Sequence, residues 1–421
     1  MNFNRFMVRL IAIATMPGMQ IANIQSLAAA GFLAASLFSH TVALRLTCLA
    51  LATALGLAMV WADSRRGEPD LRLLPPASLA FMLWALWCGL SMLWSMEPER
   101  SDKEFRNEIV YAGLAYWACF IAGQRSILCR NPLAILLVAL ISLCGLAIKA
   151  GFSENPLLGW HGGPGMHSST LLVVTPCLWG YLVWDRFSES HKLRHQIVLS
   201  VVVGLCLASA FAINNRTIWI GFTFQGLLLV GLISYWHGRT SAPSSSRTWR
   251  YWAWGSVLLL CAVTVVALYR RDGLQGLSGD GRIALWRESI SYIAESPWLG
   301  NGFGRGSVRA ALRSVFNDSV LWHSHNLFLE VLLQVGLVGL MLFILLIGSL
   351  LRSAVRHLRS DDHSQSVLGM VAGMIILGML IRNMTDMLWV RAAALTFWGA
   401  LGLVFGLASR RDAARTVAAQ P

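Results

Sequence analysis

The chain is a succession of apolar runs, most of them separated by short polar segments. A helix needs about 20 mostly apolar residues to cross the hydrocarbon core of a bilayer. Such runs predict twelve transmembrane helices, at residues 21–38, 41–61, 75–95, 105–123, 131–149, 168–184, 196–213, 216–235, 249–268, 326–351, 364–383 and 385–408. The predicted fold class is therefore an all-α polytopic membrane protein with about twelve transmembrane helices.

Basic residues between these runs fall mainly on one side of the predicted membrane. With a cytoplasmic N-terminus, the cytoplasmic segments contain 18 arginine and lysine residues, whereas the short loops opposite contain two, Arg100 and Lys103. Basic residues collect in cytoplasmic loops, so both termini are expected inside. The chain then divides into helices one to nine (1–268), a long outer loop (269–325), and the last three helices with a cytoplasmic tail (326–421).

The long outer loop carries its own helical pattern. After Asp280, apolar residues recur at the spacing of a helix from Ile283 to Ile293, and Pro297 ends the pattern. The glycine-rich string GNGFGRG follows at 300–306 and predicts a flexible turn. The loop is therefore predicted to be partly helical and to rest on the outer face of the bundle.

The amino-acid composition agrees with a membrane protein and excludes a water-soluble domain. Of the 421 residues, 56% are hydrophobic and only 13% are charged, with a mean hydropathy of +0.58, whereas a soluble chain carries about 25% charged residues. The net charge is +13, and most of the basic residues behind it lie in the predicted cytoplasmic segments. The charge is therefore explained by membrane orientation, and no nucleic-acid partner is expected. The eight cysteines form no CxxC pair and indicate neither a disulfide framework nor a zinc knuckle.

Ionisable residues within or beside the predicted spans concentrate near the outer ends of those spans. Placing an ionisable group in a membrane costs free energy, so such residues indicate a functional site. A single pocket at the outer leaflet could be lined by Arg216, His323, His325, Glu330, Arg382, Asp386 and Arg391. The alternative interpretation is snorkelling and pairing between helices, such as Arg382 with Asp386.

A transporter would be expected to place these groups near the membrane midplane. The bias to one side instead favours an enzyme that acts on a lipid-linked substrate from outside. No ATP is present there, so the substrate must bring its own activated bond. A membrane-held diphosphate with arginine partners fits this requirement.

Metal chemistry is not expected. Four histidines are predicted outside (His161, His167, His323 and His325), and the His-x-His pair could hold zinc. The outer loops contain neither an HExxH motif nor an Asp-x-Asp pair that would hold magnesium or manganese. We therefore predict no catalytic metal and no cofactor.

Three local patterns resemble the O-antigen ligase and polymerase superfamily of bacterial envelope glycosyltransferases. They are NNRTIWIGF around Arg216, GDGRIALWRESISYIAESPWLGNGFG around Arg282, and HSHNLFLEVLLQVGLVGLMLF after His323. The three patterns together cover about 55 residues. The twelve-span layout with one large outer loop extends the resemblance to the whole chain, with a fold similar to the GT-C class.

The resemblance implies an O-antigen ligase. Such an enzyme transfers a glycan from undecaprenyl diphosphate to the lipid A core oligosaccharide, without metal, on the periplasmic side of the bacterial inner membrane. The family's functional residues correspond to Arg216, Arg282 and His325. Further substrate contacts are expected from His167, His323, Asn326, Glu330, Arg382, Asp386 and Arg391.

Residue chemistry supports these roles independently of the family. Negative charge grows on the diphosphate as the glycosidic bond breaks, and Arg216 and Arg282 could hold that charge through bidentate hydrogen bonds. A neutral histidine is a suitable base for the attacking hydroxyl, and one direct displacement would invert the anomeric centre.

The sequence leaves two candidates for the base, His323 and His325. His323, Asn326, Glu330 and Gln334 share one face if the helix already extends over them, which favours His323. The resemblance favours His325, because the family's histidine directly precedes the asparagine.

Three other functions remain open from the sequence. Two belong to the same superfamily. One is an O-antigen polymerase, which joins two undecaprenyl-linked glycans, and the other is a protein O-oligosaccharyltransferase. In a different class, the chain could be a transporter of lipid-linked sugars. The sugars, the accepting hydroxyl and the oligomeric state cannot be predicted from this sequence.

Overall fold

The structure is a computed structural model of the chain. It describes residues 18–66, 72–125, 130–151, 159–186, 193–213, 215–239, 255, 258, 261–262, 265, 282–306, 308–309, 312, 323–384, 386–387, 389 and 391–418.

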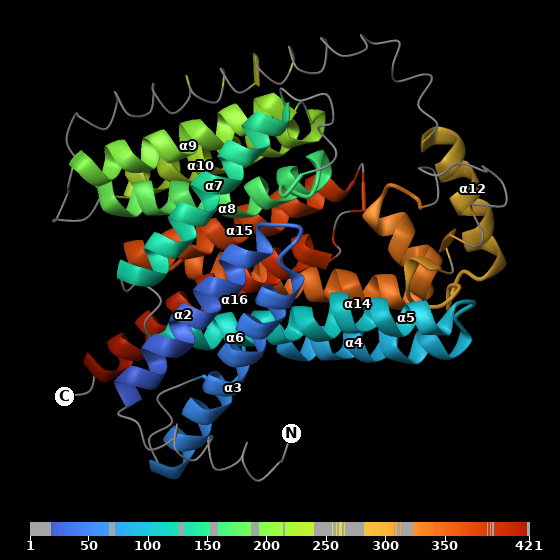
Figure 1. Cartoon of the computed structure of the whole chain (residues 1–421), viewed down its shortest axis with the longest axis horizontal. Helices are drawn as coiled ribbons and strands as arrows, with labels where there is room; N and C mark the ends of the chain where they lie inside the picture. Colours follow the sequence, from blue (N-terminus) through green and yellow to red (C-terminus); the bar gives the residue numbers. More distant parts are fainter. Residues whose placement is uncertain are drawn as a thin grey trace.

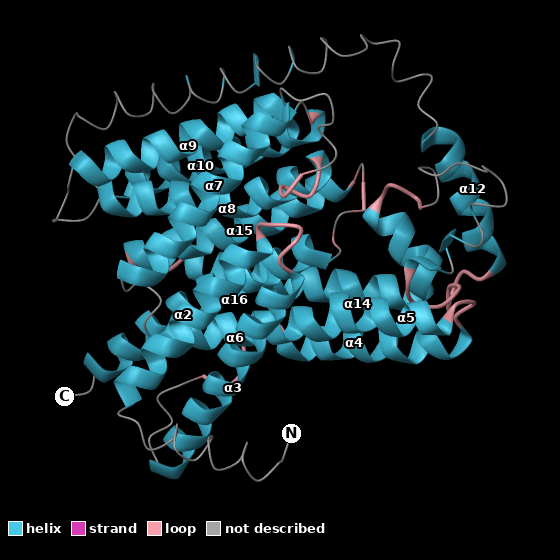
Figure 2. Ribbon diagram, in the orientation of Figure 1, coloured by secondary structure: helices cyan, strands magenta, loops and turns pink. Residues whose placement is uncertain are grey.

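The described residues form helices joined by short turns and contain no strand (Figure 2). A backbone in hydrocarbon must satisfy its own N–H and C=O groups within the segment, which favours helices at the apolar runs. The helices are α2 (Gly18–Ser36), α3 (Val42–Arg66), α4 (Ser78–Ser91), η1 (Met92–Trp94), α5 (Pro98–Phe105), η2 (Arg106–Val110), α6 (Tyr111–Arg125), α7 (Arg130–Gly151), α8 (Pro164–Arg186), α9 (Leu193–Ile213), α10 (Arg216–Arg239), α12 (Arg282–Glu295), α14 (Leu327–Leu358), α15 (His363–Asn383) and α16 (Arg391–Ala418).

A helix covers each predicted span except 249–268, most of which lies outside the described residues. Among the described residues, seven helices are long and apolar enough to cross a membrane: Val42–Arg65, Pro132–Gly151, Pro164–Trp184, Gln196–Ile213, Leu327–Leu358, His363–Asn383 and Arg391–Arg410. The prediction of an all-α, multi-pass membrane protein is confirmed. The number of twelve spans and the position of the long loop outside the membrane stay predictions.

Helix α15 lies at the centre of the bundle, in contact with α8, α10, α14 and α16 (Figure 1). A buried amide ties three of these helices together: Gln225 of α10 donates to the carbonyl oxygen of Leu172 in α8 (2.8 Å) and to that of Met374 in α15 (2.9 Å). Such side-chain bonds between helices contribute to association where hydrocarbon surrounds the protein.

Small residues allow α6 and α16 to approach closely. A Cβ at Gly402 would overlap the carbonyl oxygen of Tyr116, and one at Gly406 would overlap that of Phe120. Glycines at such contacts bring the two backbones together, so van der Waals packing replaces the hydrophobic effect that lipid weakens.

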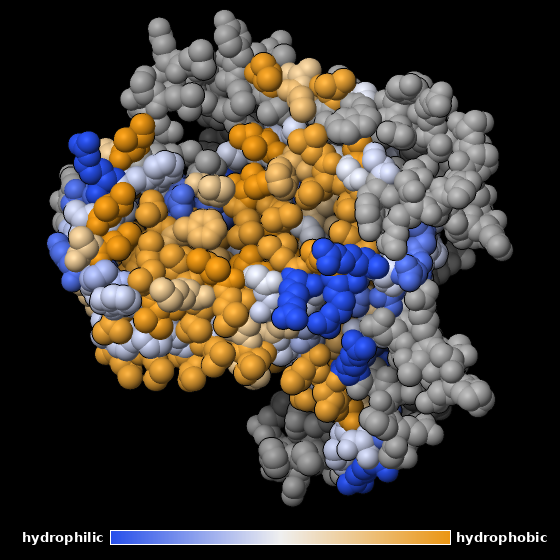
Figure 3. All heavy atoms as spheres, turned by 180° about the vertical axis from the view of Figure 1, so that it is seen from behind, coloured by the Kyte–Doolittle hydropathy of each residue, from blue (hydrophilic) through white to orange (hydrophobic). Residues whose placement is uncertain are grey.

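The surface of the bundle is largely apolar. Among the residues coloured in Figure 3, apolar side chains predominate, and hydrophilic side chains gather at the left edge and in and below a patch right of the centre. Exposed apolar residues on the helices include Leu86, Val138, Val201, Phe211 and Met341. A soluble monomer rarely exposes so much contiguous apolar surface, so this face suits contact with lipid.

Helix α12 lies at one end of the bundle, beside the first turns of α14 (Figure 1). Its Leu285 is fully buried in a small apolar cluster with Val308, Leu312 and Leu333. The helix predicted between Asp280 and Pro297 is thereby confirmed, although Asp280 itself lies outside the described residues. Part of the predicted outer loop is thus a folded element that packs on the bundle.

Candidate active site at the start of α14

The start of α14 is set by Asn326, which caps the helix. Its side-chain oxygen accepts hydrogen bonds from the backbone N–H groups of Phe328 (3.0 Å) and Leu329 (3.2 Å), two of the donors that a helix start leaves without partners. His323 and His325 therefore precede the helix, and its periodicity does not extend to them.

His325 has a backbone φ of 48°, in the left-handed region that histidine seldom occupies. Hydrogen bonds hold the N–H, the hydroxyl and the carbonyl oxygen of its neighbour Ser324. The Ser324 N–H (2.9 Å) and hydroxyl (2.7 Å) donate to the buried carboxylate of Glu330. The indole of Trp286 in α12 donates to the Ser324 carbonyl oxygen (2.9 Å). These bonds hold the turn in place against a strain of about 1–3 kcal/mol.

Glu330 and Gln334 extend this hydrogen-bond chain along the buried face of α14. The Gln334 amide donates to Glu330 (3.1 Å) and accepts from the backbone N–H of Gly304 (2.9 Å). Glu330 is fully buried, and its two oxygens are occupied by Ser324 and Gln334. The structure therefore places Glu330 behind the histidine turn, as its support.

A buried ion-pair cluster continues the network beyond Gly304. The Arg305 guanidinium donates to Glu108 (2.7 Å), and the Arg305 backbone N–H donates to Glu104 (2.6 Å). Charges this deeply buried require close partners. The cluster joins the glycine-rich string to the segment that enters α6.

The glycine-rich string packs against a break in α14. Gly336 has a φ of 65°, so helical hydrogen bonding is interrupted there. The preceding segment supplies substitutes: Leu337 N–H donates to the carbonyl oxygen of Pro297 (2.8 Å), and Asn301 N–H donates to that of Leu333 (2.9 Å). The expectation of a flexible turn at 300–306 is corrected, because backbone and side-chain bonds secure this segment.

His325 contacts the loop between α15 and α16. Its Nδ1 lies 3.3 Å from Asp386 Oδ1, and Arg382 donates to Asp386 Oδ2 (3.2 Å). Burial raises the pKa of the Asp386 carboxyl, but the hydrogen bond with His325, the charge of Arg382 and the Met387 N–H together hold it well below its usual range. Asp386 is therefore a carboxylate at any physiological pH, and its charge faces the imidazole.

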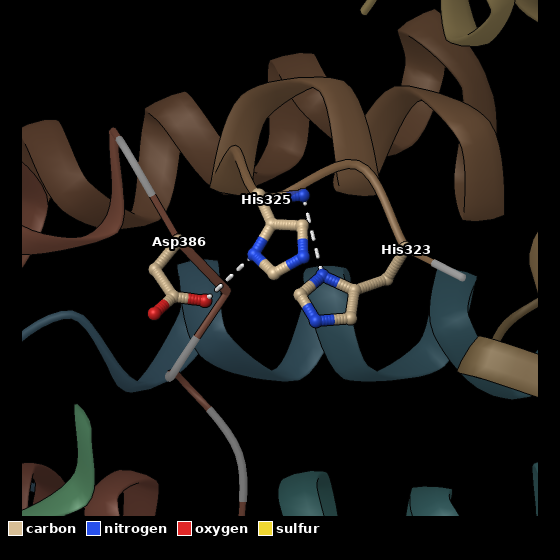
Figure 4. Close-up of side chains that lie close together, drawn as sticks. All are labelled: His323, His325 and Asp386. Atoms are coloured by element: carbon tan, nitrogen blue, oxygen red, sulfur yellow. Dashed lines mark hydrogen bonds and ion pairs between the residues drawn. The ribbon is translucent and has the colours of Figure 1, made fainter. Parts of the chain in front are cut away.

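The two histidine rings lie against each other (Figure 4). Their centroids are 3.8 Å apart at an angle of 36°, and the His325 backbone N–H donates to His323 Nδ1 (3.2 Å). One ligand atom each from His323, His325 and Asp386 lie within 4.8 Å of one another, so this group could hold a metal ion.

A cavity of about 30 Å³ lies beside the first turns of α14. This volume suits water molecules rather than a sugar. It is lined by Trp84, Cys88, Glu108, Ile109, Phe303, Leu327, Val331, Gln334, Val335, Phe343, Met387 and Trp389.

The structure brings five of the predicted site residues together at the turn: His323, His325, Asn326, Asp386 and Arg382. Glu330 supports the turn from behind, as described above.

The other predicted residues lie elsewhere or are placed only in part. Arg216 and Arg282 are the first residues of α10 and α12, and their side chains lie outside the described part of the structure. Arg391 begins α16 and is exposed. His167 is buried in α8, where its Nε2 lies 3.0 Å from Ser209 Oγ of α9; no described contact joins it to His325.

Sequence reasoning missed Trp286, Glu104, Glu108 and Arg305. The signal for the carboxylates was present: two glutamates four residues apart enter an apolar run, where they need a cationic partner. Nothing in the sequence pattern identifies Arg305 as that partner, because it lies about 200 residues away.

Fold and site together define a class: a polytopic helical membrane protein with a histidine–carboxylate site at one end of the bundle. Residues 201–344 match the family model described as O-Antigen ligase. This match covers about a third of the chain and, with the curated relatives, supports the resemblance to the O-antigen ligase superfamily that the three motifs carry. Arg216, Arg282 and His325 lie within the matched region, whereas Asp386 lies outside it.

Curated relatives agree with the family match. The chain is 24% identical over 277 residues to an O-antigen ligase of Pseudomonas aeruginosa, covering 64% of this chain and 62% of that protein. It therefore spans about three fifths of the length of that relative. It is 23% identical over 327 residues to a Rickettsia felis protein named as a polysaccharide ligase, covering 73% of this chain and 76% of that protein.

Proposed function

We propose that the chain is an O-antigen ligase of the bacterial inner membrane. It transfers a glycan from undecaprenyl diphosphate to a sugar hydroxyl of the lipid A core, on the periplasmic side and without a metal. The observation that carries this proposal is the His325–Asp386 pair at the start of α14, in a chain whose residues 201–344 match the ligase family.

His325 acts as the general base. In the tautomer whose Nδ1–H donates to Asp386, the proton of the acceptor hydroxyl goes to Nε2, the other ring nitrogen. The carboxylate orients the ring and stabilises the imidazolium that forms, and Arg382 keeps the carboxylate in place. A hydrogen-bonded carboxylate beside a histidine base serves the same purpose in other transferases and hydrolases.

The reaction is a single displacement. The hydroxyl oxygen bonds to the anomeric carbon while the bond from that carbon to the diphosphate oxygen breaks, which inverts the anomeric centre. Undecaprenyl diphosphate leaves with the electron pair. Arg216 and Arg282 hold the growing negative charge through bidentate hydrogen bonds.

The test is transfer by the purified protein in detergent, with undecaprenyl-diphosphate glycan, O-antigen-free lipopolysaccharide and EDTA. Product on the lipid A core is expected. His325→Ala is expected to lower the rate by about 10²-fold or more, and Arg282→Ala by about 10²–10³-fold. Matched controls are His40→Ala and Arg287→Ala, two exposed residues outside the site, which should retain the rate.

Other products would replace the proposal. A longer glycan still attached to undecaprenyl diphosphate would identify a polymerase, and transfer to a protein would identify an O-oligosaccharyltransferase. Movement of the donor across vesicles without any product would identify a transporter.

A further inference from the structure

Three potential metal ligands meet where the turn before α14 faces the α15–α16 loop. His323 and His325 contribute imidazoles from positions two apart, and Asp386 contributes a carboxylate from a segment about 60 residues away (Figure 4). All three side chains are partly exposed; the His325 side chain is 13% exposed and that of Asp386 is 21% exposed. The cluster is therefore accessible to a small ion from solvent.

The spacing of one ligand pair matches that around a tetrahedral ion. Ligands at about 2.1 Å from Zn²⁺ are spaced about 3.4 Å apart, and His325 Nδ1 lies 3.3 Å from Asp386 Oδ1. The three ligand atoms lie within 4.8 Å of one another, so side-chain rotations that bring them closer by up to about 1.4 Å would give all three the spacing of zinc ligands. Two imidazoles and one carboxylate are a donor set that suits zinc.

The surroundings of the cluster both support and limit binding. Arg382 donates to the outer oxygen of Asp386 (3.2 Å), which orients the carboxylate as an outer-shell partner does. The positive charge of Arg382 also repels a metal ion bound to Asp386, which weakens binding. Ser324, between the two histidines, is fixed by Glu330, so the imidazoles are held on one rigid turn. These features favour reversible binding of one ion over a permanent structural site.

We propose that His323, His325 and Asp386 bind one Zn²⁺ ion per chain reversibly, and that the bound ion inhibits glycan transfer. Inhibition rests on the proposed function, in which His325 Nε2 accepts the proton of the acceptor hydroxyl. A neutral imidazole that binds the ion through Nδ1 carries its own proton on Nε2, so it can no longer act as the base. Binding itself does not depend on that function. The ion is an inhibitor and not a cofactor, so the proposed transfer remains metal-independent.

Binding is tested on the purified full-length protein after EDTA treatment and removal of the chelator. Titration with ZnCl₂ against a chromophoric chelator is expected to show one ion bound per chain at micromolar concentration. CoCl₂ is expected to give the intense visible absorption of a tetrahedral site. His323→Ala and Asp386→Ala should each weaken Zn²⁺ binding by at least about ten-fold, and His40→Ala, at an exposed histidine, should leave it unchanged.

The conservative variants His323→Gln and Asp386→Asn guard against misfolding; they must elute as the parent protein does on gel filtration before their affinities are compared. The inference is overturned if ZnCl₂ does not bind at micromolar concentration, or if binding persists in all site variants.

Inhibition is read separately, as the ratio of the transfer rate with ZnCl₂ to the rate with EDTA for each variant. The parent protein should lose most of its activity in ZnCl₂, and His323→Gln should lose a smaller fraction. Full activity with Zn²⁺ bound would overturn the inhibitory role. If no transfer is detected under any condition but Zn²⁺ binds as predicted, the proposed function fails while the metal site stands.

Discussion

At the scale of the residue, His325 owes its position to neighbours that are distant in sequence. Its left-handed backbone is held by bonds from Glu330 and Trp286 to Ser324, and its ring is oriented by Asp386. The sequence supported either His323 or His325 as the base. The position of Asn326 as helix cap removes the periodicity that favoured His323, and the contact with Asp386 supports the proposed role of His325.

Replacing Asp386 tests whether this carboxylate orients the His325 ring. Asp386→Asn removes the negative charge and can present an N–H to His325 Nδ1, which favours the wrong tautomer. Transfer is expected to fall by about 10²-fold or more at saturating substrate, with little change in KM for the donor. The measurement is steady-state transfer of labelled glycan in detergent.

The matched control is Asp361→Asn, at an exposed aspartate before α15. It should keep the parent rate. A change of less than two-fold in Asp386→Asn would contradict the orienting role of this carboxylate.

At the scale of the element, α14 differs most from its prediction. The sequence predicts one span at 326–351, whereas the helix runs from Leu327 to Leu358 with a break at Gly336. A continuous helix of that length would be about 48 Å long, well beyond the 30 Å hydrocarbon core. The part after the break, 337–358, is about 33 Å long and matches one crossing. The part before it is free to carry the histidine turn.

Gly336→Ala should disrupt this element. Alanine at a φ of 65° costs about 1–2 kcal/mol, and its Cβ would overlap the carbonyl group of Trp298. The free energy of unfolding is expected to fall by at least about 2 kcal/mol, as measured by thermal unfolding in detergent.

Gly348→Ala is the control in the same helix. No atom lies within 4 Å of the added Cβ, so the change should be neutral or stabilise the helix by up to about 1 kcal/mol. Equal stability of the two variants would show that the break at Gly336 does not matter to the fold.

At the scale of the whole molecule, hydropathy and charge determine the class and the expected orientation, and packing determines which ends meet. Helix α15 is central because α8, α10, α14 and α16 all contact it. The candidate site joins the start of α14 to Trp286 of α12 and to the α15–α16 loop. The proposed periplasmic location therefore requires these ends to share the outer side of the membrane.

Single cysteines test that orientation. Glu295, at the end of α12, and Asp361, before α15, are both exposed, and the charge pattern puts them on opposite sides of the membrane. In intact spheroplasts, a membrane-impermeant maleimide should label Glu295→Cys, whereas Asp361→Cys should react only after lysis. The unsubstituted chain measures labelling of the native cysteines. The reverse pattern would place the site in the cytoplasm.

The membrane class, the positions of most helices and the resemblance to the ligase family could be predicted from the chain alone, because apolar runs of bilayer length and local motifs are properties of contiguous residues. The same pattern placed His325, Asp386 and Arg382 close together, as the structure has them. Three features could not be predicted and needed the folded chain: Glu330 lies behind the turn, Arg305 pairs with Glu108, and α14 breaks at Gly336. Those outcomes depend on contacts between segments far apart in the chain, where neither periodicity nor composition carries information about partners.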